Sequence, residues 1–111
     1  LSSNYLTELE QGVFSNLKKI RNLDLSFNNI INLKNMTFFG LKNLNSLSLS
    51  FNKINSIDIY AFYGLESLLE LSLYSNKIID IKAEHFSFME NLEILHLTDN
   101  FIENINKNSF L

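Results

Sequence analysis

The hydrophobic positions along this chain return every 24 residues. Leucine, isoleucine and phenylalanine occupy the same places in each copy, and no insertion or deletion interrupts the period. Such a strict period indicates tandem copies of one structural unit. The clearest columns are Leu1, Leu25, Leu49, Leu73 and Leu97, and Phe14, Phe38, Phe62, Phe86 and Phe110.

Each unit contains a short stretch in which apolar and small polar residues alternate. In the third copy, Leu47 and Leu49 alternate with Ser46, Ser48 and Ser50. An alternation of period two predicts a short strand with one buried face. The next such stretch comes 24 residues later without a hairpin signal. The strands are therefore expected to be parallel and joined by crossovers.

The segment between two strands has apolar residues at irregular spacing. Ile54, Ile57 and Phe62 fit loops or short helical turns better than a full helix. Coils stacked at the strand spacing of about 4.8 Å form a solenoid with a parallel sheet on one face.

An asparagine follows each predicted strand, where the backbone turns away from the sheet and loses its ladder partners. Its side chain has donors and an acceptor, so we predict that it bonds the backbone of its own coil and of the next one. Asparagines outside this column, such as Asn43, are interpreted as compositional background. The predicted ladder consists of Asn4, Asn28, Asn52, Asn76 and Asn100.

The unit LxxLxxLxLxxNxIxxIxxxxFxx resembles the leucine-rich repeat, in the 24-residue class that carries a phenylalanine. The resemblance implies an α/β-type solenoid: a leucine-rich repeat arc with a concave parallel β-sheet and a mostly irregular convex side. We interpret residues 1–111 as one segment, with a partial repeat at 1–16 and repeats at 17–40, 41–64, 65–88 and 89–111. Polar caps normally close a solenoid. We expect a fragment that lacks both caps, with Leu1 and Leu111 near raw edges.

The same class is similar to the extracellular domains of Toll-type receptors, Slit-like guidance proteins and adhesion proteins. The resemblance implies a non-catalytic module of a cell-surface receptor or secreted protein, which binds a protein ligand on its concave face. An intracellular scaffold or substrate-recognition subunit is the alternative, although cytosolic repeat classes usually run at other periods.

Composition excludes several other classes of function. The chain has no cysteine, so disulfides, thiolate chemistry and cysteine-based zinc sites are absent. Its net charge of -3 and the lack of a basic stripe argue against nucleic-acid binding. No apolar run approaches the roughly 18 residues of a membrane span, so no direct membrane insertion by this segment is expected.

The outward positions of the predicted sheet hold the candidate binding residues. Phe27 and Phe51 fall on successive coils with Tyr74 nearby, and neighbouring exposed aromatics are typical anchors for a protein partner. In the alternative, phenylalanine merely fills the place before the ladder asparagine. Further predicted contact residues are Asp24, Glu70, His96 and Asp99.

Glu70, Glu93, His96 and Asp99 form a second predicted cluster towards the carboxyl-terminal end. It could accept a basic partner, and this interaction could weaken near pH 6 as the histidine becomes charged. A plain solvated face is the alternative.

His96 beside Asp99 also raises the question of catalysis or metal binding. No third ligand or nucleophile stands at a defined spacing, and an open sheet does not exclude water. His85 is expected in a convex loop, far from His96. The sequence therefore predicts no enzyme, metal or cofactor.

Asn35 begins the only N-x-[ST] sequence, Asn35-Met36-Thr37, on the predicted convex crossover. It is a possible N-glycosylation site if the protein is secreted.

Overall fold

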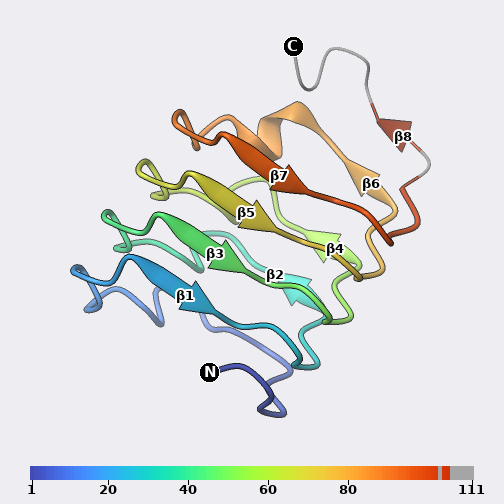
Figure 1. Ribbon diagram of the computed structural model, residues 1–111, viewed down its shortest axis with the longest axis horizontal. Coiled ribbons are helices and arrows are strands. Elements are labelled where there is room, and N and C mark those ends of the chain that lie inside the picture. Colours follow the sequence, from blue (N-terminus) through green and yellow to red (C-terminus); the bar gives the residue numbers. More distant parts are fainter. Residues whose placement is uncertain (103, 106–111) are drawn as a thin grey trace.

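The computed structural model describes residues 1–102, 104 and 105, and it shows a stack of coils with one strand of each coil in a common sheet (Figure 1). The four strands are parallel and adjacent in chain order. Because every coil has the same length, the strands align without slippage, with Leu23 opposite Leu47 and Leu47 opposite Leu71. The strands are β1 (Asn22–Asp24), β3 (Ser46–Ser48), β5 (Glu70–Ser72) and β7 (Ile94–His96).

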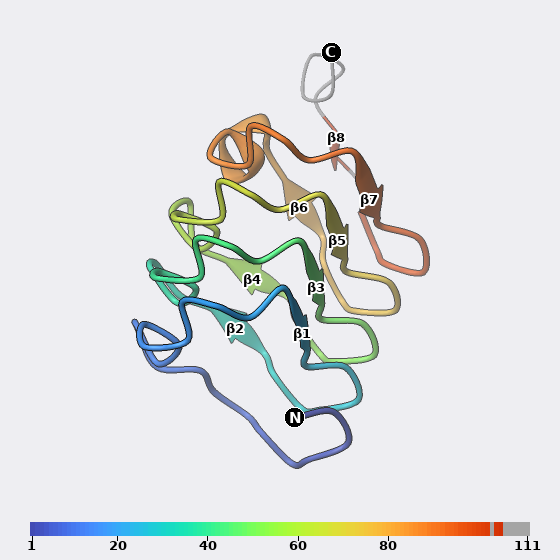
Figure 2. The same ribbon diagram turned by 60° about the vertical axis from the view of Figure 1, so that its left-hand side comes forward.

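The convex crossovers contain more regular structure than the sequence predicted. Two-residue strands pair in parallel there, and Figure 2 shows them as a second row behind the main sheet. The equal repeat length that aligns the main strands also brings equivalent crossover segments within hydrogen-bonding distance. The pairs are β2 (Asn32–Leu33) with β4 (Ser56–Ile57), and β6 (Asp80–Ile81) with β8 (Asn104–Ile105). One 3-10 helix, η1 (Ala83–Phe86), follows β6.

The core lies between these two rows. Leu47, Leu49 and Leu71 from the sheet are buried, and so are the rings of Phe38 and Phe62 from the crossovers. Rings of the phenylalanine column stack along the solenoid, with centroids 6.1 Å apart for Phe38 and Phe62. From Phe14 to Phe86, each described copy contributes leucines and one ring that pack against the neighbouring coils.

The fixed asparagine ties each coil to the one before it. Asn52 Nδ2 donates to the carbonyls of Leu49 in its own coil and Leu25 in the preceding coil, both at 3.0 Å. Its Oδ1 accepts the Ile30 backbone N–H at 3.1 Å. The predicted direction, towards the next coil, is wrong. Asn28, Asn76 and Asn100 repeat the pattern of Asn52.

Asparagines outside the ladder also bridge coils, against the interpretation of Asn43 as background. Asn43 Nδ2 donates to the Lys18 carbonyl at 2.7 Å, and Asn91 Nδ2 donates to the Glu66 carbonyl at 2.8 Å. Asn4 bonds within its own turn, donating to the carbonyls of Leu1 and Ser2.

Candidate binding surface

The predicted aromatic residues meet at the point where the main strands end. The rings of Phe27 and Phe51 stack with centroids 4.5 Å apart and planes 5° from parallel. Tyr74 lies edge-on to Phe51, with centroids 5.3 Å apart. Phe27, Phe51 and Tyr74 are 55%, 42% and 38% exposed. We refer to these three residues as the aromatic cluster.

The backbone of the two phenylalanines is left-handed, a feature that the sequence pattern did not indicate. Phe27 has φ 58° and Phe51 has φ 57°. Ser75 and Asp99, which take the equivalent places in the next two repeats, share this conformation. Small polar residues adopt this region more readily than bulky ones. Neither backbone preference nor core packing therefore accounts for phenylalanine at these two places.

The second predicted cluster is only partly assembled. His96 Nε2 lies 2.9 Å from Glu70 Oε2, and both side chains are exposed. Asp99 instead accepts a hydrogen bond from the Ser75 hydroxyl. Glu93, which directly precedes β7, is exposed. Exposed pairs of this kind contribute little to stability, so the Glu70–His96 pair is available to a partner.

Asp24 is held by the residue two places after it. The Ser26 hydroxyl donates to its carboxylate at 2.5 Å and the Ser26 backbone N–H donates at 2.9 Å. These bonds favour the charged form and lower the pKa of Asp24. Ser50, which the alternating pattern placed on the exposed face, is buried, and so is Ser26 at the equivalent place one repeat earlier. The Ser50 hydroxyl lies 2.5 Å from that of Ser72, so packed neighbours cover it.

The concave side carries negative charge without a compensating cation. The four strands and the three residues after each contain no lysine or arginine, over 22–27, 46–51, 70–75 and 94–99. They contain the carboxylates of Asp24, Glu70 and Asp99. A partner here meets an acidic surface with aromatic rings along one side.

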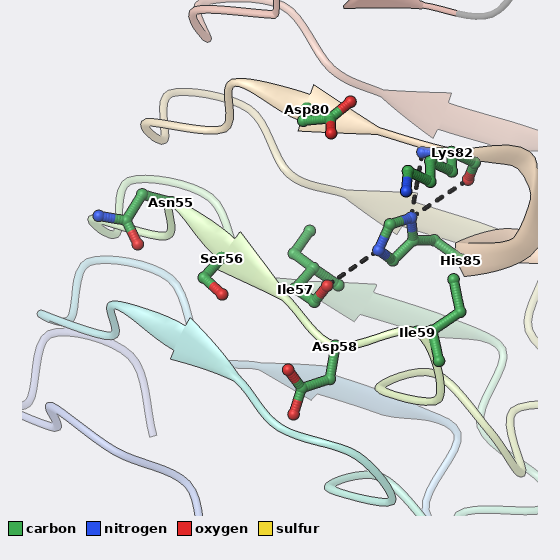
Figure 3. A pocket seen from close by; sticks show the side chains of 8 residues that line it. All are labelled: Asn55, Ser56, Ile57, Asp58, Ile59, Asp80, Lys82 and His85. Carbon is green, nitrogen blue, oxygen red and sulfur yellow. Dashed lines mark hydrogen bonds between the residues drawn. The ribbon is translucent and has the colours of Figure 1, made fainter.

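His85 lies on the opposite side of the molecule and serves the fold. It is buried on η1, whereas the sequence predicted a convex loop at this position. Its Nε2 lies 2.9 Å from the Ile57 carbonyl and its Nδ1 lies 3.0 Å from the Lys82 backbone N–H (Figure 3). With Nδ1 accepting and Nε2 donating, both nitrogens are satisfied and neither is left for a metal or substrate.

A polar hollow of about 380 Å³ lies beside this ring. Figure 3 shows its lining, which comes from the crossovers of two successive coils: Asn55, Ser56, Ile57, Asp58, Ile59, Asp80, Lys82 and His85. Among the described residues, no three histidine, aspartate or glutamate side chains are grouped closely enough to hold a metal ion.

Asn35 is exposed on the convex crossover. Its side-chain Oδ1 accepts a hydrogen bond from the Tyr60 backbone N–H at 2.9 Å. The Asn35 backbone N–H donates to Asp58 Oδ2 at 3.1 Å. Thr37 of the same motif is buried, and its hydroxyl donates to the Lys34 carbonyl at 2.7 Å. The carboxamide nitrogen, to which a sugar would attach, has no partner among the described residues.

The repeat pattern and the coil geometry correspond to a known family. A family model described as leucine rich repeat matches three overlapping ranges, residues 1–54, 18–78 and 42–102. The chain is a leucine-rich repeat protein. The expected fold class, an arc with a parallel sheet, is confirmed, and a leucine-rich repeat domain is a protein-interaction module.

A solved structure has a similar fold to most of this leucine-rich repeat protein. It superposes on a chain in the glycosylated form of the Drosophila Toll–Spatzle complex with TM-score 0.83 and 30% identity. The alignment covers 92% of this chain and 15% of that one. No curated protein matches it in sequence. In the described part of the chain, no helix has the length and apolar character needed to cross a bilayer.

Proposed function

We propose that the protein is a non-catalytic binding module that holds a protein partner on its concave sheet. The observation that carries this proposal is the aromatic cluster, in which three exposed rings contact one another beside an acidic sheet. Aromatic side chains are enriched among the residues that dominate binding energy at protein interfaces. Their mutual contact fixes the rings before a partner arrives, which lowers the entropy lost on binding.

The local backbone supports the same proposal. Left-handed φ at a bulky residue costs free energy, and such outliers concentrate at functional sites. Ser75 and Asp99 hold the same conformation with small side chains, so the fold does not require phenylalanine there. A role in contacting a partner gives a reason for Phe27 and Phe51 that folding does not.

Catalysis has little support on this surface. The sheet is open to water, and His96 contacts a carboxylate that is itself exposed, with no nucleophile in the pair. Reactions generally need a water-excluding pocket and a nucleophile within reach of a base.

We further propose that the module belongs to the ectodomain of a cell-surface receptor or to another secreted protein. The 24-residue repeat class and the likeness to a chain of the Toll–Spatzle complex support this. Because this chain spans 15% of that one, receptor signalling and the identity of the partner remain part of the proposal.

Phe51→Ser tests the concave site, because Ser75 shows that serine fits the same backbone conformation. The secreted protein is screened against an array of extracellular proteins, and the affinity of each binder is measured by surface plasmon resonance. We expect Phe51→Ser to weaken binding by about tenfold or more, as truncation of an interface anchor does.

Ile79→Asn is the matched control. Ile79 is exposed on the convex side, and Asn55 occupies the equivalent place one repeat earlier. Affinity should be unchanged in this variant. A binder that loses affinity with Ile79→Asn and retains it with Phe51→Ser would contradict the concave site.

A further inference from the structure

One lateral edge of the solenoid has a charge pattern that is complementary to itself. This edge is formed by the stacked turns that precede β1, β3, β5 and β7, at the left of Figure 1. We call it the turn edge and define it by four equivalent segments, 15–18, 39–42, 63–66 and 87–90. It is separate from the concave sheet.

The last position of each segment is charged. From the first segment to the fourth, the residues are Lys18, Lys42, Glu66 and Glu90. All four side chains are exposed. Glu70–His96 is the sole ion pair within the described residues, so these two cations and two carboxylates have no ionic partner in that part of the chain.

Exposed aromatic rings occupy the centre of the same edge. Phe39 and Tyr63 stack with centroids 6.1 Å apart, and 49% and 38% of their surfaces are exposed. Ser15 and Ser87 take the equivalent places in the outer two segments. Beside the rings lies a hollow of about 300 Å³, lined by Lys18, Phe39, Gly40, Lys42, Gly64 and Glu66.

We propose that two copies of this chain associate through their turn edges, about a two-fold axis between the second and third segments. Such an axis reverses the order of the segments in the partner copy, so Lys42 faces the partner's Glu66 and Lys18 faces the partner's Glu90. Phe39 then faces the partner's Tyr63. A two-fold interface uses the same surface patch on both copies, which requires this kind of self-complementarity.

A second column of residues, next to the one that holds the lysines and glutamates, has the same pairing of opposite charges about the proposed axis. Three residues after the last position of the first segment stands Arg21, and three residues after that of the fourth segment stands Glu93; both are exposed. The proposed axis places them opposite each other. Adjacent coils are spaced by about 4.8 Å, so a single axis brings every pair of rows into register. A parallel side-by-side arrangement would instead place lysine on lysine and glutamate on glutamate.

Charge reversal at the centre of the edge tests the dimer. Sedimentation velocity of the full chain over a range of concentrations should show a monomer–dimer equilibrium. Lys42→Glu places like charges opposite each other twice in the dimer, and Glu66→Lys does the same. We expect each to raise the dissociation constant by about tenfold or more.

Two rescue experiments separate intermolecular pairing from a general loss of folding. The double variant Lys42→Glu/Glu66→Lys restores opposite charges across the axis and should dimerise again. An equimolar mixture of the two single variants should form a heterodimer, because each then supplies the charge that the other lacks. Lys53→Glu makes the same charge change at an exposed lysine away from the edge and should leave the dimer intact.

A wild-type chain that is monomeric at every concentration would overturn the proposal. Growth into open-ended assemblies, or a dimer that Lys42→Glu does not weaken, would overturn it as well. The concave binding experiment is independent of these outcomes, since its variants lie on another face.

Discussion

Single asparagines show how much of this fold depends on one side chain per repeat. Asn52 is buried and satisfies backbone groups in two coils at once. The Ile30 N–H and the Leu25 carbonyl that it bonds have turned away from the sheet ladder. Only a short side chain with both a donor and an acceptor can serve both groups.

Asn52→Ala is therefore expected to destabilise the protein by about 1–3 kcal/mol, because buried backbone groups lose their partners. Urea unfolding followed by circular dichroism measures the change. Asn55→Ala, an exposed asparagine on the convex side, is the control and should alter the midpoint little. Equal midpoints for Asn52→Ala and the wild type would disprove the structural role of the ladder.

Phe51 and Phe62 show why residue type alone did not identify the binding surface. Both are phenylalanines of the same repeat, but Phe62 is fully buried and Phe51 is 42% exposed. The sequence period distinguished their columns. The left-handed backbone at Phe51 and its stacking on Phe27 became visible only in the structure.

The turns that precede the main strands differ in backbone conformation between copies of the repeat. Gly40 and Gly64 have φ of 102° and 97°, while the residues at the same place in the other repeats, Asn16 and Phe88, are not among the residues with positive φ. The backbone of these turns therefore changes with the residue available. An added Cβ at Gly40 would lie 2.7 Å from the Ser15 Cα of the preceding coil.

Gly40→Ala should accordingly lower the free energy of unfolding by more than about 2 kcal/mol, through backbone strain and this contact. Gly12→Ala is the comparison, because Gly12 also has positive φ but its Cβ would meet nothing within 4 Å. We expect a loss of about 1 kcal/mol there. Urea midpoints of the two variants decide the matter, and a larger loss at Gly12 would contradict the close approach.

The whole molecule presents three distinct surfaces, and the asparagine at 35 lies on the convex one. The concave sheet carries the proposed partner site and the turn edge carries the proposed dimer contact. Asn35 is not one of the residues that define either of these surfaces. This arrangement permits glycosylation, partner binding and dimerisation in one protein.

If the protein is secreted, as proposed, the form produced in eukaryotic cells should carry an N-linked glycan at Asn35. Intact mass spectrometry before and after N-glycosidase treatment measures it, and Asn35→Gln should remove the difference. Binding and dimerisation should be unchanged in that variant. A secreted protein without the modification would contradict the assignment of Asn35.

The sequence by itself determined the coil and the order in which coils stack. Its period placed Leu47 and Leu49 in the core, Phe62 behind them and Asn52 at the turn, because every repeat must bury the same positions against its neighbours. The requirement for burial acts on each position of the repeat separately. The residues found at one position in successive repeats are therefore enough to show whether that position is buried.

Only the tertiary structure decided which side chains meet on the surfaces. Glu70 contacts His96, whereas Asp99 accepts a hydrogen bond from Ser75. His85, which was expected in a loop, is buried. These outcomes depend on rotamers and on left-handed backbone angles, which a hydrophobic period does not encode. Stacking then placed residues 24 positions apart side by side, and the complementary charges of the turn edge arise from this spacing.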